Sequence, residues 1–425
     1  MREGALHAAL EADFTEPVRD PLWGNIFLSP GLEAVAASPA FAKLGRIRQL
    51  GPAQLVYPGA THSRRAHSLG VFHTAKRLVA ALARREGLDF VTREGLLSFL
   101  LAALCHDLGH FPFAHSLKEL PLEPHEALTA RLLRAEPLRG LAGRAGADPE
   151  LAAAIVDESL PGSGGRELPF FRGLLSGVLD PDKLDYLSRD AFQCGVPYGV
   201  QDIDFVLQRV ALGPGDRLGV DERGIMAVEG ILFSKYLMYR SVYWHRGVRA
   251  ATAMVKKAVL LAVEAGELAL EELYGLDDES FFSRIRSLGP RARASAALAE
   301  AVFEGRLYGA VLDLPFDPAE PRHAALLDLG SRLGLEAAIA EAAGAGLGPA
   351  GIIVDLPEPI SFETELPVLL GEGGGGGSAS FSESPTVFKP PVVAGFAASL
   401  RRIRVFAAEA WPAVEAAARK ALGAA

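Results

Sequence analysis

The distribution of histidine is the feature that most constrains how this chain can fold. Seven of its ten histidines lie between residues 62 and 125: His62, His67, His73, His106, His110, His115 and His125. A hydrophobic core offers no packing reason to gather imidazoles. A metal or phosphate site does, because neutral imidazole binds metals and imidazolium donates protons near neutral pH. We therefore expect several segments of this region to converge on one polar cavity.

Hydrophobic periodicity predicts that most of roughly the first 300 residues are helical. Apolar residues recur at three- and four-residue spacing in five stretches, 33–50, 70–85, 94–108, 125–134 and 229–266. Between residues 217 and 228, two short β-prone runs flank Asp221–Gly224 and predict a β-hairpin with its turn at those residues. The fold is therefore expected to be mainly α with one short hairpin.

The predicted secondary structure changes towards the C-terminus. Residues 351–356 and 402–406 predict buried strands, and a helix is expected after the second. Residues 371–380 are mainly Gly and Ser, which predicts a flexible loop with no core of its own. We predict a helical domain over residues 1–330 and a small α/β lobe over residues 331–425.

Composition bounds the environment and the partners. The net charge of -9 argues against a protein that coats nucleic acid, which needs a clustered basic surface. Two cysteines, Cys105 and Cys194, cannot form a disulfide framework, so a reducing compartment is favoured. Residues 1–20 lack the apolar stretch of a signal peptide, and apolar runs fall short of the roughly 20 residues that cross a bilayer. We expect a cytoplasmic protein that contacts no membrane and gives no indication of nucleic-acid binding.

The sharpest local motif is Cys-His-Asp-Leu-Gly-His at residues 105–110. His106 and Asp107, adjacent on the last turn of a predicted helix, can both reach one cation. Gly109 then permits a sharp turn, and Pro112 prevents the helix from continuing. An isolated His-Asp pair is more often a hydrogen-bonded helix end, but the neighbouring histidines favour a ligand site.

Two further segments carry groups of matching chemistry. His67 stands at the start of a predicted amphipathic helix, and the preceding loop offers Arg64 and Arg65, whose guanidinium groups suit phosphate oxygens. Residues 180–190 hold four aspartates, which at a helix start are usually solvated. The leucines among them define an apolar face, so some of these carboxylates are expected to line a cleft: Asp180, Asp182, Asp185 and Asp190.

In order and spacing, these motifs resemble the HD-domain phosphohydrolases and, within them, the deoxynucleoside triphosphate triphosphohydrolases. The resemblance covers roughly residues 40 to 250. It rests on five segments: 44–71 with Arg64 and His67, 106–115, the pair His125–Glu126, 180–190, and 239–245.

The resemblance implies an HD-type helical core and a divalent metal held by His67, His106, Asp107 and Asp182. This ligand set suits Fe, Mn, Co, Ni or Zn, with Mg²⁺ as an ion accompanying the substrate phosphates. It further implies that His125 is the general acid, acting with His110 and Asp107. The implied phosphate contacts are Arg64, His115, Lys183, Tyr186 and Lys235, and the implied sugar contacts are Gln49, Leu50, Asp190 and Tyr243.

The implied reaction is hydrolysis of a deoxynucleoside triphosphate at its α-phosphorus, which releases a deoxynucleoside and tripolyphosphate. Family habit also implies a homo-oligomer, either a dimer or a tetramer. Two alternatives stay open. One is an HD hydrolase of another nucleotide phosphoester, a monophosphate or a signalling nucleotide, and the other is a nucleotide-sensing protein with weak turnover.

The sequence departs from the family pattern in three respects. Lys118 stands where a carboxylate usually partners the general acid, so we expect Glu119 or Glu126 to take that role. Lys235 stands where the family has an arginine, which keeps the charge but loses the fork of donors. Small residues replace the side chains that form a guanine activator pocket in some members, so activation of that kind is not expected: Ala37, Ala42 and Gly45.

Overall fold

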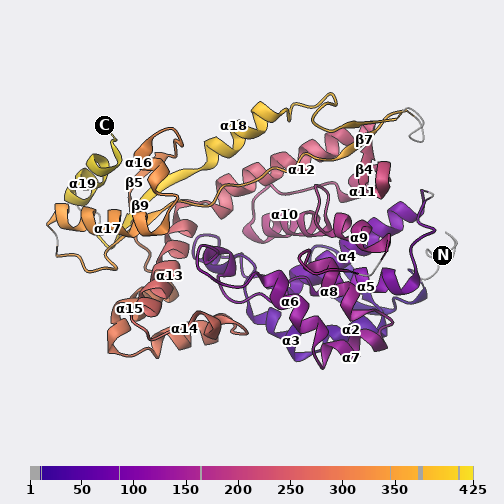
Figure 1. The fold of residues 1–425 in the computed structure, drawn as a ribbon, viewed down its shortest axis with the longest axis horizontal. Coiled ribbons are helices and arrows are strands. Elements are labelled where there is room, and N and C mark those ends of the chain that lie inside the picture. The colour runs from indigo at the N-terminus through magenta and orange to yellow at the C-terminus, as the bar shows by residue number, and fades with distance from the viewer. Residues whose placement is uncertain are drawn as a thin grey trace.

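A computed structural model describes residues 10, 12–85, 87–162, 165–344, 346–371, 377–409 and 412–424. This part of the chain is mainly helical, with three small sheets (Figure 1). The predicted fold class, a helical core with a small α/β lobe, is confirmed. Among the described helices, none combines the length and the apolar character needed to cross a bilayer.

The N-terminal half is a helical core that carries a β-hairpin at its edge. The hairpin pairs β1 (Glu16–Asp20) with β2 (Gly24–Leu28). The helices of this half are α2 (Pro30–Ala36), α3 (Pro39–Lys43), α4 (Arg64–Ala83), α5 (Arg93–Cys105), α6 (His125–Arg134), α7 (Leu138–Arg144), α8 (Pro149–Val156), α9 (Glu167–Leu175) and α10 (Pro181–Cys194). Their buried apolar residues form one large hydrophobic cluster.

Side-chain caps fix where the helices that matter for the site begin. Ser63 accepts a hydrogen bond from the Ala66 N–H and starts α4, and Thr92 does the same for α5. Asp180 accepts from the Lys183 N–H at the start of α10. Such caps satisfy backbone donors that have no partner within the helix. They place His67, His106 and Asp182 near helix ends, where side chains can meet.

The predicted helix at 33–50 is wrong, because the chain breaks there into two short helices. Ser38 caps α3 and accepts from the Phe41 N–H, and Pro39 occupies the first helical position. This Ser-Pro pair ends one helix and begins another. The prediction of one helix over 229–266 is also wrong. Here α12 (Ile225–Met238) and α13 (Arg246–Glu264) are separated by a π-helical turn at Tyr239–Tyr243.

The prediction of a hairpin with its turn at Asp221–Gly224 is wrong, because the first predicted strand pairs with the strand before it and not with the residues after it. The strand β4 (Leu218–Asp221) pairs with the preceding β3 (Val210–Leu212), which follows α11 (Ile203–Arg209). The Asp221 side chain accepts from the Gly224 N–H and closes a short 3₁₀ turn that leads directly into α12. The residues expected to form the second strand therefore begin a helix.

After α13 the chain forms α14 (Asp278–Arg286), α15 (Arg293–Phe303) and a small α/β lobe. The lobe's sheet has the order β5-β9-β6, with β9 (Arg402–Ala407) antiparallel to both β5 (Gly309–Pro315) and β6 (Ile352–Asp355). Its helices are α16 (Pro321–Ala325), α17 (Leu329–Ala343) and α19 (Pro412–Leu422). The strands predicted at 351–356 and 402–406 are confirmed, as is the helix after the second.

Between β6 and β9 the chain leaves the lobe, crosses to the far end of α12 and returns (Figure 1). There β7 (Pro367–Leu369) pairs in parallel with β4 and antiparallel with β8 (Ser378–Ser380). The return helix α18 (Pro390–Leu400) packs on α12, where the rings of Tyr236 and Phe396 stack 4.6 Å apart. Half of the predicted glycine-rich loop at 371–380, residues 372–376, lies outside the described residues, and its last three residues form β8, so the loop prediction is wrong there. The domain boundary at residue 330 stays a prediction.

Candidate functional site

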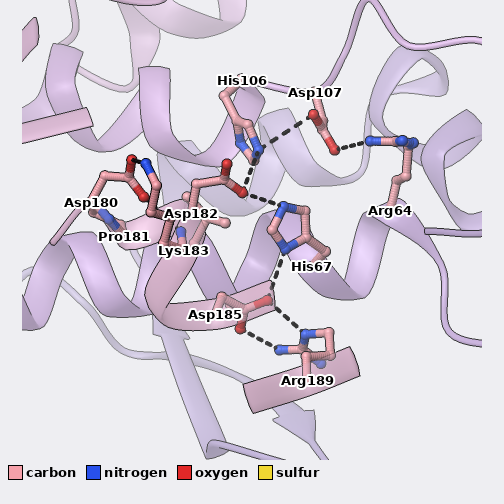
Figure 2. Close-up of polar contacts among 12 residues, drawn as sticks. Arg64, His67, His106, Asp107, Asp180, Pro181, Asp182, Lys183, Asp185 and Arg189 are labelled. Atoms are coloured by element: carbon pink, nitrogen blue, oxygen red, sulfur yellow. Dashed lines mark hydrogen bonds and ion pairs between the residues drawn. The ribbon is translucent and has the colours of Figure 1, made fainter. Parts of the chain in front are cut away.

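Three distant segments bring the four predicted metal ligands together (Figure 2). His67 comes from the first turn of α4, His106 and Asp107 from the end of α5, and Asp182 from the first turn of α10. The Nε2 atom of His67 lies 2.9 Å from Asp182 Oδ1. The Nε2 atom of His106 lies 3.9 Å from the same oxygen and 3.4 Å from Asp107 Oδ1.

The chemistry of these residues fits a divalent cation. His67, His106 and Asp107 each offer a ligand atom, and the three atoms lie within 4.8 Å of one another. The Nδ1 atom of His106 lies 3.0 Å from the Ala103 carbonyl, which can only accept, so Nε2 keeps its lone pair. That Nε2 is buried and makes no hydrogen bond to any described residue. A buried imidazole nitrogen without a partner requires an explanation, and a bound metal supplies one.

Asp185, one helical turn after Asp182, orients His67. Its Oδ2 lies 2.9 Å from His67 Nδ1, and the Arg189 guanidinium binds both of its oxygens, at 2.8 and 2.9 Å. Figure 2 shows His67 between Asp182 and Asp185. A carboxylate behind a ligating histidine fixes the tautomer and the ring orientation. The sequence predicted only that some of the aspartates in this segment line a cleft, although the spacing of Asp185 from Asp182 already placed it on the same helix face.

The electrostatics and the packing of this layer agree with that arrangement. Burial lowers the pKa of His67, but the carboxylates of Asp182 and Asp185 raise it to about 10, which indicates negatively charged surroundings suited to a cation. Gly70 permits the close approach of α4 to α10. A Cβ atom there would lie 1.8 Å from Asp185 Oδ1 and 2.4 Å from Arg189 Nη2.

A second group of imidazoles adjoins the first through Asp107. The ring of His110 lies 3.8 Å from the ring of His125 and 4.8 Å from that of His115, centroid to centroid. The Nε2 atom of His110 is 3.3 Å from Asp107 Oδ1, and Arg64 Nη1 donates to Asp107 Oδ2 at 2.7 Å. Burial and the charge of Arg64 hold the pKa of His110 well below its ordinary value, so this imidazole is neutral.

Some polar atoms of this second group lack partners. Both ring nitrogens of His110 and the Nε atom of Arg64 are buried without a hydrogen bond within the described ranges. Asp107, His110 and His125 also offer ligand atoms within 4.8 Å of one another. Neutral imidazoles and a buried guanidinium can together donate hydrogen bonds to an anion. This group therefore suits an anionic ligand, such as a phosphate, that is accompanied by a cation.

Of the two carboxylates expected to partner His125, the structure places Glu126 there. Glu126 Oε2 lies 3.1 Å from His125 Nδ1. Glu119 instead accepts from Lys256 Nζ at 2.5 Å and from Arg332 Nη1 at 3.2 Å. The side chain of Lys118 is exposed to solvent. Glu126, the residue after His125, therefore supplies the carboxylate that the family pattern has at position 118.

Of the four predicted sugar contacts, Asp190 and Tyr243 meet directly, and the Gln49 N–H donates to the carbonyl of His62, which also contacts Asp190. Asp190 Oδ2 accepts from the Tyr243 hydroxyl at 2.7 Å, and its Oδ1 lies 2.7 Å from His62 Nε2. The side-chain Oε1 of Gln49 is buried without a partner among the described residues, and Leu50 beside it is half-buried. Sequence reasoning gave His62 no role, although it belongs to the same histidine-rich stretch.

The predicted phosphate-binding lysines already have partners in the chain. Lys183 Nζ donates to Asp180 Oδ2 at 2.6 Å and to the Gly177 carbonyl at 2.8 Å. Lys235 Nζ donates to the Ser361 carbonyl at 2.8 Å and to Glu363 Oε2 at 3.2 Å. The ring of Tyr186, which completes the predicted phosphate set, lies 6.3 Å from that of Tyr243. No motif in the sequence pointed to Glu363.

Two family models match the chain. The HD domain matches residues 64–176, and the HD associated region matches residues 202–372. His67, His106 and Asp107 lie in the first stretch, and Lys235 and Glu363 lie in the second.

Among proteins of similar sequence, an uncharacterized protein of Bacillus subtilis is 36% identical over 220 residues, 51% of this chain. An uncharacterized protein of Methanocaldococcus jannaschii is 29% identical over 272 residues, 63% of this chain. Deoxynucleoside triphosphate triphosphohydrolase SAMHD1 of Danio rerio is 28% identical over 347 residues, 70% of this chain. The matches cover 48%, 54% and 56% of these relatives, so the chain spans about half of their length.

Solved structures share the fold over nearly the whole chain. A hypothetical protein of Aquifex aeolicus superposes with a TM-score of 0.70 at 24% identity and covers 96% of this chain and 99% of its own. A phosphohydrolase of Bacteroides thetaiotaomicron superposes with a TM-score of 0.69 at 22% identity, covering 92% and 99%. At these identities the likeness shows the architecture.

Proposed function

The chain belongs to the HD-domain family, and on that premise we propose that it is a metal-dependent phosphohydrolase acting on deoxynucleoside triphosphates. The observation that carries this proposal is the convergence of His67, His106, Asp107 and Asp182, with buried imidazole nitrogens that make no hydrogen bond among the described residues. The similarity to a deoxynucleoside triphosphate triphosphohydrolase supports the substrate class.

In the proposed reaction, the four converging side chains hold one divalent transition metal. When bound, such a cation lowers the pKa of a coordinated water and offsets the charge of a phosphate. Arg64 holds Asp107 in place through Nη1, and its unpartnered Nε–H is available to a phosphate oxygen. The neutral rings of His110 and His115 lie beside it and can donate to further phosphate oxygens.

His125 is the proposed general acid for the leaving 5′-oxygen. Glu126 lies at its Nδ1, which leaves Nε2 to carry and deliver the proton. A positioned acid is needed because an unprotonated alkoxide is a poor leaving group, and general acid catalysis contributes about 10²–10⁴-fold. The reaction then releases a deoxynucleoside and tripolyphosphate.

The proposed sugar site is built around a carboxylate held on two sides. His62 and Tyr243 fix Asp190, and the free Oε1 of Gln49 can accept from the sugar 3′-hydroxyl. Both oxygens of Asp190 are already paired, and the 3′-hydroxyl would occupy Gln49 Oε1, so a ribose 2′-hydroxyl would be buried without a partner. This arrangement favours deoxyribose.

A second candidate function is supported by the ion pairs that the two predicted phosphate-binding lysines already make. Lys183 and Lys235 are already engaged by Asp180 and Glu363, which favours a substrate with a single phosphate. The alternative is thus a hydrolase of nucleoside monophosphates or another nucleotide phosphoester. Assembly into a dimer or tetramer and a cytoplasmic location stay predictions.

Product analysis separates these functions. The metal-loaded full chain is incubated with matched dNTPs, NTPs and dNMPs, and the products are separated by ion-exchange chromatography. Release of tripolyphosphate supports the proposed function, and orthophosphate released from monophosphates supports the alternative. Binding of dNTPs without any product would instead identify a nucleotide sensor. Asp107→Asn is the matched control, because it keeps the size of the side chain and removes its charge.

A further inference from the structure

The segment between β6 and β7 places a carboxylate on the two lysines beside the candidate site. Glu363 Oε2 lies 3.2 Å from Lys235 Nζ and 3.6 Å from Lys183 Nζ. The lysine side chains are 7% and 14% exposed, whereas that of Glu363 is 41% exposed. Two nearly buried ammonium groups thus meet one accessible carboxylate.

The backbone around Glu363 is anchored independently of this ion pair. The neighbouring Phe362 and Leu366 are buried in the large hydrophobic cluster of the helical core. Phe362 also lies under the Lys235 ammonium, 5.6 Å from it, and Lys235 donates to the Ser361 carbonyl. The Glu363 side chain can therefore turn towards solvent while the segment and Lys235 stay in place.

The location of the lysines ties this anion site to the metal cluster. Lys183 directly follows the candidate ligand Asp182 on the first turn of α10. An anion bound between Lys183 and Lys235 would therefore lie next to a phosphate held at the cluster. A carboxylate carries one negative charge, whereas the distal part of a polyphosphate carries several, so the polyphosphate is the stronger partner for two ammonium groups.

We propose that Glu363 determines specificity for the number of phosphates in the substrate. It occupies the anion site of Lys183 and Lys235 until a polyphosphate displaces it, whereas a monophosphate at the metal cluster leaves it in place. Glu363 thereby reduces what a substrate gains in affinity from its second and third phosphates. This inference rests on the proposed phosphohydrolase function.

The test compares Glu363→Gln with Glu365→Gln in the full chain. The first variant keeps the size of the side chain and an acceptor oxygen but removes the charge. The second makes the same change at an exposed glutamate of the same segment. Titration calorimetry measures binding of inorganic tripolyphosphate. We expect Glu363→Gln to bind about fivefold more tightly, the ratio equivalent to about 1 kcal/mol, the upper range for an exposed ion pair. Glu365→Gln should match the unmodified protein.

Two further measurements complete the test. In a Lys235→Gln background, the effect of Glu363→Gln should be smaller, because the nearer of the two ammonium groups that Glu363 contacts is gone and only Lys183 remains. In turnover assays, Glu363→Gln should lower the KM for a dNTP by a similar factor and leave the KM for a dNMP unchanged. Equal or weaker tripolyphosphate binding by Glu363→Gln would overturn the proposal. Absence of dNTP hydrolysis in the unmodified protein would refute the proposed function alone, since the calorimetric comparison needs no turnover.

Discussion

Two regions of the molecule bury many charged side chains, but they pair them differently. Where α13 meets the C-terminal lobe, each buried cation faces an acid: Arg249 faces Asp355, Lys256 faces Glu119, and Lys257 faces Glu336. In the His/Asp cluster between α4, α5 and α10, Arg64 Nε, His106 Nε2 and both His110 nitrogens make no hydrogen bond among the described residues.

This difference distinguishes charged groups that stabilise the fold from charged groups that are available to bind a ligand. At the junction, Arg332 Nε and Arg404 Nη1 are also without partners, but other nitrogens of both guanidinium groups bind Glu119 or Asp313. A closed pair stabilises the fold only while both members are present, since a lone buried charge is costly. The nitrogens that make no hydrogen bond in the His/Asp cluster stay available to bind a ligand. Substitutions in the His/Asp cluster should therefore remove function, and substitutions at the junction should remove stability.

The largest effect is expected from removing two of the four proposed metal ligands together. The double substitution His106→Ala and Asp107→Ala should abolish both metal content and hydrolysis, because it deletes the helix-end pair that α5 contributes. Elemental analysis and turnover measure the result, and circular dichroism should show the fold retained. Full metal stoichiometry in this variant would eliminate the proposed site.

The converse substitution at the junction is Arg249→Ala. Arg249 binds Asp355 through two hydrogen bonds of 2.5 and 2.9 Å, and Asp355 is fully buried. Removing the guanidinium leaves an uncompensated carboxylate, so we expect a loss of about 3–5 kcal/mol in unfolding free energy. Urea denaturation measures it, and Arg419→Ala, at a surface pair with Glu415, is the control. A loss below about 1 kcal/mol would break the comparison, because that is typical of surface pairs.

His125→Ala should reduce turnover by at least about 100-fold, the lower range for loss of a general acid. Metal content should be unchanged, because His125 lies outside the four proposed ligands. Steady-state kinetics and elemental analysis together test both halves of this expectation. Near-normal turnover would transfer the acid role to His110 or His115.

The sugar site predicts a preference of about tenfold or more for dNTPs over NTPs, because buried groups shaped for one substrate discriminate by at least 1–3 kcal/mol. Parallel rates on dATP and ATP give the ratio, and Tyr243→Phe should lower it by freeing one oxygen of Asp190. Equal rates would favour the broader phosphoester alternative.

The smallest effect is expected at Lys118. Its side chain is exposed, and Glu126 already lies at His125. Lys118→Ala should therefore change turnover by less than about twofold, within the range of neutral surface substitutions. A crippled Lys118→Ala enzyme would show that this lysine acts on the substrate directly.

The sequence predicted what is encoded locally. His106 and Asp107 are adjacent, His67 begins a periodic helix, and Asp182 follows a capping Asp180, so local motifs and the family resemblance that they carry were enough to propose these four residues as ligands. The breaks in the predicted helices at 33–50 and 229–266 were missed for different reasons. Ser38 and Pro39 are a legible local stop, whereas the π-helical turn before Trp244 depends on tertiary packing.

Contacts between distant segments could not be predicted. Glu363 reaches Lys235 across 128 residues of sequence, and Arg332 reaches Glu119 across 213. Neither contact has a local signature, because each depends on how the C-terminal chain crosses the helical core. The choice of Glu126 over Glu119 as the neighbour of His125 was likewise decided by Arg332 and Lys256, which hold Glu119 elsewhere.

The strand order of the lobe has a consequence for biosynthesis. β9, the central strand of β5-β9-β6, is the last strand to leave the ribosome. Until residues 402–407 emerge, β5 and β6 have no neighbour and expose open edges, which are prone to pair with other chains. The helical core can form much earlier during translation. A premature stop before residue 402 would therefore release a chain with a nearly complete active-site region and an aggregation-prone tail.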